Sequence, residues 1–388
     1  MADKKIINLS KKRNKKTLKK IFSVLKIPIV ILVVVAALFL SARLLGNVAV
    51  SNITDGIRNI KTLFSDGGGY PYPIEAFGYG KTVDLGGKPM IIYDGSCVNL
   101  SSSAGKVFEM PLTYANSKAV TKNGRALIFS NSSNSVILRS RTEQLGTVSE
   151  SGPIVAAALA KNGSIATSHA TDEYQSVLNV YNSRFKKIFE WDCAQERIAD
   201  ISLSSNGKKI AALAIGAENA EIYTRILIFS AGSDEPVADV KYSGTLFLKV
   251  VYTDSNRVIA VGDNRTVVLG KDGTQLDELI YSEDSISAVC SDGSGNTVVC
   301  YEEFGGSKSG IVRFSKSGKR TCSFSFDGVP DCMDADGGKI ALVSGKEIIV
   351  YSSTGKEQRR IETENSVSEI ICCSGSIYTV ESGEIHKY

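Results

Sequence analysis

The sequence of 388 residues contains few of the side chains that most often carry catalysis or metal binding. It has two histidines, His169 and His386, and one tryptophan, Trp191. No Gly-x-Ser-x-Gly motif and no Cys-x-x-Cys motif occurs in it. A histidine-based metal site or catalytic triad is hard to assemble from so few histidines. We therefore expect no catalytic residue, no metal and no cofactor.

The cysteines give little support for disulfides. There are eight: Cys97, Cys193, Cys290, Cys300, Cys322, Cys332, Cys372 and Cys373. Most stand at apolar strand-like positions, where cysteine behaves as a small hydrophobe. Cys290 and Cys300 flank one predicted hairpin and are the one pair whose placement suits a disulfide. The sequence leaves open whether they are bonded.

Positive charge is concentrated at the N-terminus. Residues 1–26 hold ten Lys and Arg against Asp3, a charge of +9, and Arg43 adds one more. Because the whole chain carries +4, residues 47–388 carry −6. An acidic main domain argues against nucleic acid as the partner, since phosphate binding needs a basic face.

A long apolar run follows the basic tail of residues 1–20. Residues 27–40 are uncharged, and the apolar character continues through Leu45. About twenty such residues span a bilayer core, so we predict one transmembrane helix over residues 21–46, in contact with the lipid bilayer. The basic flank predicts a cytoplasmic N-terminus and an extracellular main domain. A cleaved signal peptide is less favoured, because no small-x-small site follows the apolar core closely.

Beyond a stalk and glycine hinge at residues 47–69, one hairpin pattern recurs eight times. An apolar run, a polar turn and a second apolar run repeat, as in "ISLSSNGKKIAALA" at residues 201–214. The turn residues are Gly87, Gly124, Gly163, Gly207, Asn256, Gly295, Gly338 and Gly375. Their mean spacing is about 41 residues, which is the length of one four-stranded propeller blade.

The pattern predicts an all-β fold, with a β-propeller over residues 70–388 after the N-terminal transmembrane helix. We expect eight four-stranded blades, or seven if the first unit is irregular, because a ring lets every blade bury both faces. Two stacked β-sandwiches fit the regular spacing less well. The last unit ends after three strands at Tyr388, so we predict that residues 70–77, "YPYPIEAF", supply its outer strand.

This layout resembles the broad superfamily of WD40-like and quinoprotein-like propellers. Within it, the chain is most similar to uncharacterised single-pass, surface-exposed propeller proteins of Gram-positive bacteria. The resemblance covers about residues 70–388 and rests on the blade pattern, so it implies a fold and no activity. Trp191-Asp192 falls on a predicted outer strand and does not match the family's Trp-Asp signature. Quinone-binding blades need more tryptophans than this sequence has.

Two functions are open. The first is a non-catalytic binding or scaffold module at the cell surface, whose partner is an envelope protein or a cell-wall polymer. Its candidate ligand face lies on loops near the inner strands, at Tyr72, Tyr242, Tyr281, Glu283 and Asp284. The alternative is an extracytoplasmic glycan-processing enzyme in which paired carboxylates, such as Glu302 and Glu303, act as acid and base.

The predicted topology can be checked on intact cells. Protease added to sealed protoplasts should digest the propeller and spare the first twenty or so residues, because only the basic tail is expected in the cytoplasm. Immunodetection of an N-terminal and a C-terminal tag would follow the two ends. Survival of residues 70–388 in sealed protoplasts would contradict this orientation.

Overall fold

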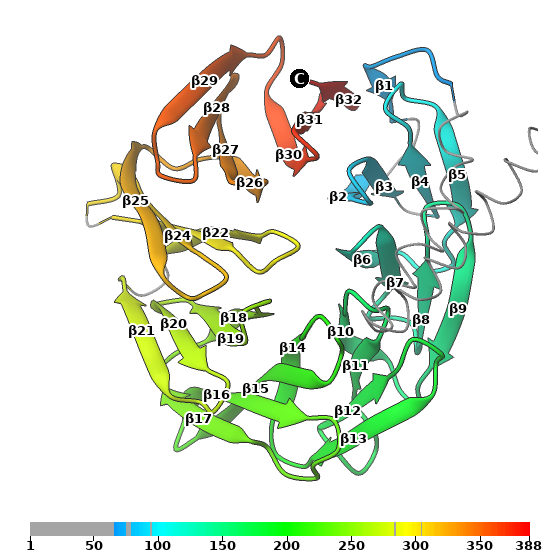
Figure 1. The fold of residues 1–388 in the computed structure, drawn as a ribbon, viewed down its shortest axis with the longest axis vertical. Coiled ribbons are helices and arrows are strands. Elements are labelled where there is room, and N and C mark those ends of the chain that lie inside the picture. Colours follow the sequence, from blue (N-terminus) through cyan, green and yellow to red (C-terminus); the bar gives the residue numbers. More distant parts are fainter. Residues whose placement is uncertain (1–65, 75–78, 94, 283–284, 304) are drawn as a thin grey trace, which may run out of the picture. The chain divides into compact units, whose positions relative to one another are not determined.

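The computed structural model describes residues 66–74, 79–93, 95–282, 285–303 and 305–388, which form eight four-stranded antiparallel sheets. The sheets follow one another around a ring as the blades of a propeller (Figure 1). The predicted eight blades are confirmed, and the alternative of seven is wrong. No helix in the described ranges is long and apolar enough to cross a membrane. The predicted transmembrane helix lies outside those ranges.

Blades 1 to 8 follow the chain, and each has four strands from the channel outward. The innermost strands are β2 (Tyr79–Asp84), β6 (Lys118–Lys122), β10 (Ile154–Leu159), β14 (Arg197–Leu203), β18 (Phe247–Tyr252), β22 (Ile286–Ser291), β26 (Cys332–Asp336) and β30 (Val367–Cys373). The second strands are β3 (Pro89–Tyr93), β7 (Arg125–Phe129), β11 (Ile165–His169), β15 (Lys209–Glu218), β19 (Arg257–Gly262), β23 (Thr297–Glu302), β27 (Lys339–Ser344) and β31 (Ser376–Glu381). The third strands are β4 (Ser96–Leu100), β8 (Ser135–Arg139), β12 (Ser176–Tyr181), β16 (Glu221–Ser230), β20 (Arg265–Gly270), β24 (Lys308–Phe314), β28 (Glu347–Ser352) and β32 (Glu384–Lys387). The outermost strands are β5 (Lys106–Pro111), β9 (Gln144–Ser149), β13 (Lys187–Cys193), β17 (Ala238–Ser243), β21 (Gln275–Ile280), β25 (Arg320–Asp327), β29 (Glu357–Glu362) and, in blade 8, β1 (Tyr72–Pro73).

The repeated sequence pattern is the inner hairpin of each blade. All eight predicted turn residues have φ between 55° and 87°, the left-handed region that a tight hairpin turn requires. Seven of them are glycine and one is Asn256, the residue types that adopt this conformation most readily. At Gly87 a side chain would also crowd a neighbour, because a Cβ would lie 2.2 Å from Ser374 Oγ in blade 8 and that hydroxyl would have to move.

The core consists of eight apolar clusters, one between each pair of neighbouring blades. Strand β15 of blade 4 shows how one strand serves two clusters. Its residues Ile210 and Ala212 pack toward blade 3, whereas Ala211 and Leu213 pack toward blade 5. Successive side chains of a strand point to opposite faces, so an uninterrupted apolar strand needs a neighbour on each side.

The two ends of the described propeller meet in blade 8. Tyr72 pairs with Ile385 and Pro73 pairs with Glu384, so β1 lies beside β32 (Figure 1). The main-chain N–H of Ile74 continues the pairing by donating to the carbonyl of Gly383 at 2.8 Å. Proline is tolerated here because the outermost strand leaves one edge unpaired. The predicted closing strand is thus confirmed at residues 72–74, and residues 75–78 lie outside the described ranges.

All eight cysteines are free thiols. Cys300 lies opposite Ala288 and Cys290 lies opposite Val298, so the pair that the sequence left open is not bonded. Both side chains belong to the apolar cluster between blades 6 and 7. The cysteines therefore act as small core residues, as most of their positions predict.

Removing the closing strand should destabilise the ring. A chain that lacks only residues 70–77 loses β1 and exposes the edge of β32 and the cluster between blades 8 and 1, so it should melt at a lower temperature and aggregate. A chain that lacks only residues 47–65 keeps every described contact and is the matched control. Equal melting of the two truncated chains would show that β1 does not close the ring.

Candidate functional site

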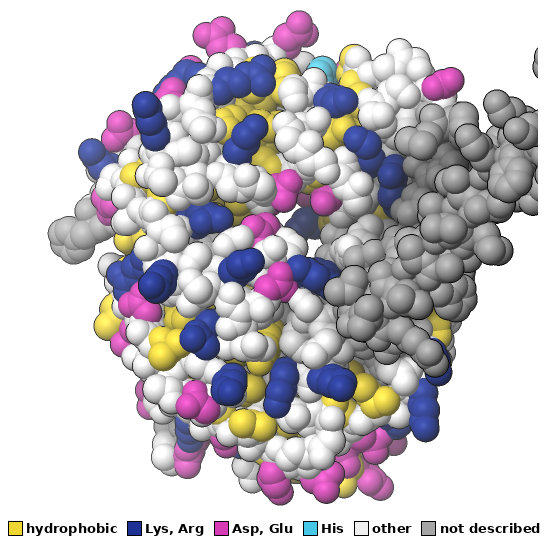
Figure 2. All heavy atoms as spheres, viewed as in Figure 1, with side chains coloured by type: hydrophobic (Ala, Val, Ile, Leu, Met, Phe, Trp, Pro, Cys, Tyr) yellow, Lys and Arg dark blue, Asp and Glu magenta, His cyan; other side chains and the backbone are white. Residues whose placement is uncertain are grey.

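The central channel of the ring contains a cavity. Side chains of β2, β22, β26 and β30 line a cavity of about 540 Å³. Acidic and basic side chains both gather around the central opening on the face shown in Figure 2. A propeller channel is a common ligand position, so the hydrogen-bond partners of its carboxylates decide what it can do.

The channel carboxylates connect neighbouring blades. Glu369 Oε2 accepts the main-chain N–H of Thr82 at 2.8 Å, which joins blade 8 to blade 1. Asp334 Oδ2 accepts the main-chain N–H of Cys372 at 2.7 Å, which joins blade 7 to blade 8. Burial raises the pKa of Asp334 to about 6 and that of Glu369 to about 7. These contacts give both side chains a structural role.

The carboxylate pair that the sequence suggests for glycan processing, Glu302 and Glu303, does not lie in this cavity. Glu302 ends β23, a second strand, and neither it nor Glu303 is among the residues that line the channel cavity. Glu303 Oε1 accepts the hydroxyl of Ser325 at 2.6 Å at the surface. In the described part of the chain, no group of three or more His, Cys, Asp or Glu side chains could hold a metal ion.

A second cavity, of about 590 Å³, lies at blade 3, and two of its lining residues, His169 and Asn179, each have a buried polar atom without a hydrogen-bond partner. We call it the acidic groove. Its lining residues are Ser149, Glu150, Ser151, His169, Thr171, Asp172, Glu173, Tyr174, Val177, Asn179, Tyr181, Lys187, Glu190 and Asp192. They come from the end of β9 (Gln144–Ser149) and the loop before β10, from β11 and the loop after it, and from β12 and β13.

Strand register brings the base of the groove together. Thr167 of β11 lies opposite Asn179 of β12, and Tyr181 is two residues further on, so the three side chains share one face. All three donate to the carboxylate of Glu150: Thr167 Oγ1 at 2.5 Å, Asn179 Nδ2 at 2.8 Å and Tyr181 Oη at 3.0 Å. The Glu150 side chain is 4% exposed, and these three bonds fix the loop before β10 against the blade.

Ser151 and His169 meet next to Glu150. Ser151 Oγ lies 3.1 Å from His169 Nε2, and His169 Nδ1 lies 3.8 Å from Glu150 Oε2. His169 is 2% exposed whereas Ser151 is exposed. Burial lowers the pKa of His169, so its imidazole is neutral at pH 7. A neutral imidazole beside a hydroxyl can accept its proton.

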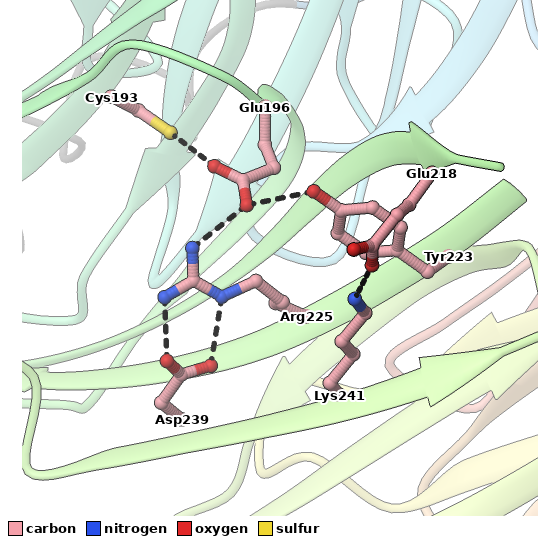
Figure 3. A network of polar contacts seen from close by, with 7 residues as sticks. All are labelled: Cys193, Glu196, Glu218, Tyr223, Arg225, Asp239 and Lys241. Carbon is pink, nitrogen blue, oxygen red and sulfur yellow. Dashed lines mark hydrogen bonds and ion pairs between the residues drawn. The ribbon is translucent and has the colours of Figure 1, made fainter.

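A third cavity, of about 580 Å³, lies at the corresponding place in blade 4, and its charges are compensated. Figure 3 shows Arg225 between two carboxylates: it donates to Glu196 at 2.8 Å and to both oxygens of Asp239 at 2.5 and 2.9 Å. Lys241 donates to Glu218 at 2.6 Å. Burial opposes ionisation of Glu196, but hydrogen bonds from Cys193 and Arg225 outweigh it and lower the pKa of Glu196.

Register shows why blades 3 and 4 differ. Ile165 of β11 and Ile210 of β15 are equivalent, since each is the last partner of its inner strand. Counting from them, the positions of Arg225 and Asp239 in blade 4 correspond to Val177 and Glu190 in blade 3. Blade 3 therefore has a carboxylate, Glu190, where blade 4 has Asp239, but it has Val177 where blade 4 has the compensating Arg225.

The structure does not gather the sequence-predicted ligand face at one place. Tyr72 lies on β1 in blade 8, and Tyr242 lies on β17 in blade 4, where its hydroxyl donates to Gln275 at 2.7 Å. Tyr281 follows β21, is 8% exposed and donates to the carbonyl of Gly262 at 2.6 Å. Glu283 and Asp284 lie outside the described ranges. Ligand contact at these five residues stays a prediction.

Sequence reasoning missed Ser151 and His169, although one signal was present. The loops before inner strands were identified as ligand-facing, and Ser151 lies in such a loop. In the hairpin that turns at Gly163, His169 pairs with Ile154. Ile154 follows Ser151 by three residues in the chain, so the hairpin brings His169 close to Ser151. The residues are thus close in space because of the hairpin register, and no local motif marks them.

Stability should depend on the protonation of Glu369. The folded-state pKa of about 7 lies above the unfolded value of about 4.3, so the stabilising contribution is full below that unfolded value and is lost as pH rises through 7. Glu369→Gln keeps an acceptor for Thr82 and removes the titration. Relative to this variant, the wild-type free energy of unfolding should fall by about 3 kcal/mol as the pH is raised from acid to mildly alkaline conditions. The free energy of unfolding is measured with denaturant at each pH. The same pH dependence in the wild type and in Glu369→Gln would contradict the raised pKa of Glu369.

Solved propellers share this fold. The C-terminal WD40 domain of Sif2 matches with a TM-score of 0.56 at 13% identity, over 82% of this chain and 98% of that one. The Dos1 propeller matches with a TM-score of 0.54 at 11% identity, over 84% of this chain and 95% of that one. Dihydro-heme d1 dehydrogenase NirN matches with a TM-score of 0.53 at 11% identity, over 82% of this chain and 74% of that one. At such identities the likeness shows the fold alone, and it agrees with the predicted propeller fold.

A comparison with curated proteins finds no match. The model of a family of unknown function, DUF5711, matches residues 75–387, which include all of the propeller except β1. By this match, the chain belongs to the DUF5711 family.

Proposed function

We propose that this protein is a binding module of the cell envelope. Residues 21–46 hold the propeller at the outer face of the membrane, and the acidic groove binds a ligand that carries an ammonium or guanidinium group. The propeller fold is consistent with a binding or scaffold module. What supports the anchor is the +9 flank followed by the uncharged apolar run of residues 27–40.

The observation that carries the ligand assignment is uncompensated negative charge in the groove. Its carboxylates are Glu150, Asp172, Glu173, Glu190 and Asp192. Lys187 is the one lysine or arginine among the lining residues, and it is already paired with Glu190. Five carboxylates and one lysine leave a charge of −4, which attracts cations and repels anions.

A buried hydrogen-bond acceptor of the groove, Asn179 Oδ1, also favours a ligand that carries a hydrogen-bond donor. Asn179 is 2% exposed, and its Oδ1 has no hydrogen-bond partner although its Nδ2 is bonded to Glu150. Leaving such an acceptor unpaired costs about 1–3 kcal/mol. An ammonium or guanidinium group supplies several N–H donors together with the missing positive charge. Free amino groups on a wall polymer and basic side chains of an envelope protein share this chemistry.

The groove carboxylates can be tested by removing charge without changing shape. The double variant Glu190→Gln, Asp192→Asn lowers the negative charge of the groove, so the affinity of the full chain for an amine-bearing wall polymer should fall about tenfold. Val177→Arg supplies the cation that blade 4 has at Arg225 and should weaken binding similarly. Co-sedimentation of the detergent-solubilised chain with the polymer measures both effects.

Two controls make this result interpretable. Asp234→Asn, Glu235→Gln changes charge by the same amount on an exposed loop outside the groove and should leave binding unchanged. N-acetylation of the polymer removes its positive charge and should abolish binding, and a lysine-rich peptide tests the protein source of the same chemistry. Equal binding of native and acetylated ligands, or equal losses in groove and control variants, would refute the proposed ligand class.

A further inference from the structure

The acidic groove contains a serine that has the surroundings of a nucleophile. Ser151 is exposed to the groove, and its Oγ lies 3.1 Å from Nε2 of the buried His169. The opposite ring nitrogen, Nδ1, has no hydrogen-bond partner and lies 3.8 Å from the carboxylate of Glu150. A hydroxyl, an imidazole and a carboxylate in this order are the parts of an activated nucleophile.

The position of each part is fixed by the blade. Glu150 is held by Thr167, Asn179 and Tyr181, so the carboxylate cannot move away from the imidazole without breaking three hydrogen bonds. His169 is the last residue of β11 and is buried, which restricts its ring. In unliganded enzymes such contacts are often longer than in the reacting complex, so 3.8 Å is compatible with an orienting role for Glu150.

We propose that Ser151 is a nucleophile, with His169 as its general base and Glu150 as a positioning residue, and that it cleaves carboxylic esters whose acyl part carries a cationic group. The preference for a cation rests on the proposed function of the groove, whereas the reactivity of Ser151 does not. Scarcity of histidine in the sequence predicts binding without turnover, but one histidine is sufficient when a serine and a carboxylate lie beside it.

The reaction needs only the ester and water. Ser151 Oγ bonds to the carbonyl carbon while its proton passes to His169 Nε2, and Glu150 stabilises the resulting imidazolium. The bond between that carbon and the alcohol oxygen then breaks, and the imidazolium gives its proton to the departing oxygen. Water attacks the acyl-serine, one proton returns through His169 to Ser151 Oγ, and a carboxylic acid and an alcohol have been formed.

The chemistry can be tested with a fluorophosphonate probe, which is attacked only by activated serines. In the full chain, we expect mass spectrometry to find the phosphonyl group on Ser151. Ser151→Ala should abolish labelling, and it should not affect folding because the side chain is exposed. His169→Gln should slow labelling at least about 100-fold, because the general base is lost. Ser325→Ala is the control: that exposed serine bonds to a carboxylate without a histidine, and its loss should change nothing.

The pH dependence of labelling separates a base from a packing residue. Four charged groups bear on His169 from the groove: Glu150, Lys187, Glu190 and Asp192. Burial is the largest influence and lowers the pKa of His169 below its usual value of about 6.5, so the labelling rate should rise through that lowered value and be constant above it. No label on Ser151, or an unchanged rate in a folded His169→Gln protein, would overturn the proposal.

Substrate charge is tested separately. The p-nitrophenyl ester of 6-aminohexanoate carries a cation, and the p-nitrophenyl monoester of adipate carries an anion of similar length. We expect kcat/KM to favour the cationic ester by about tenfold or more, and Glu190→Gln, Asp192→Asn to reduce that preference. Labelling of Ser151 without any charge preference would leave the nucleophile in place and refute the cationic substrate class and the ligand assignment of the groove. Absence of label on Ser151 in folded protein refutes the catalytic proposal by itself, whatever the charge preference in ester hydrolysis.

Discussion

Every blade of this propeller depends on having two neighbours. Strand β15 is apolar on both faces, with Ile210 and Ala212 packed toward one neighbour and Ala211 and Leu213 toward the other. An open row of blades would expose one such face at each end, at a cost of about 25 cal/mol for each Å² of apolar surface. The pairing of β1 with β32 removes both open ends at once, because it fixes blade 8 against blade 1.

Ring closure also fixes the positions of the loops that connect neighbouring blades. The loop before each inner strand begins on one blade and ends on the next, so its two ends are fixed by neighbouring sheets. Glu150 shows the result: its carboxylate receives hydrogen bonds from β11 and β12, and Ser151 is consequently held beside His169. A loop held at both ends and by hydrogen bonds to Glu150 restricts the motion of its side chains, which the proposed orientation of Ser151 requires.

The sequence is sufficient to predict the blades because their signals are local. Gly163 and Asn256 indicate hairpin turns, because both residue types readily adopt the positive φ that such turns require. The last unit has three strands of its own, which predicts that another segment supplies the fourth. The groove has no comparable signal. Ser151 and His169 are separated by 18 residues and meet through the register of one hairpin, and Asn179 reaches Glu150 through a second. Tyr281, which the repeat phase assigns to the candidate ligand face, stacks its ring on Tyr301 in the cluster between blades 5 and 6.

Repetition explains how one blade can acquire a site without disturbing the others. Blades 3 and 4 share their register, yet Arg225 of blade 4 corresponds to Val177 of blade 3, and Ala214 corresponds to His169. In blade 4 the arginine satisfies Glu196 and Asp239, so that cavity needs no ligand to balance its charge. In blade 3 the carboxylates face an open groove with Lys187 as the one opposing cation among the lining residues. Ala214 belongs to the cluster between blades 3 and 4, whereas Val177, His169 and Arg225 belong to no apolar cluster. Polar differences at these positions therefore change the charge of a groove and leave most of the packing that maintains the ring in place.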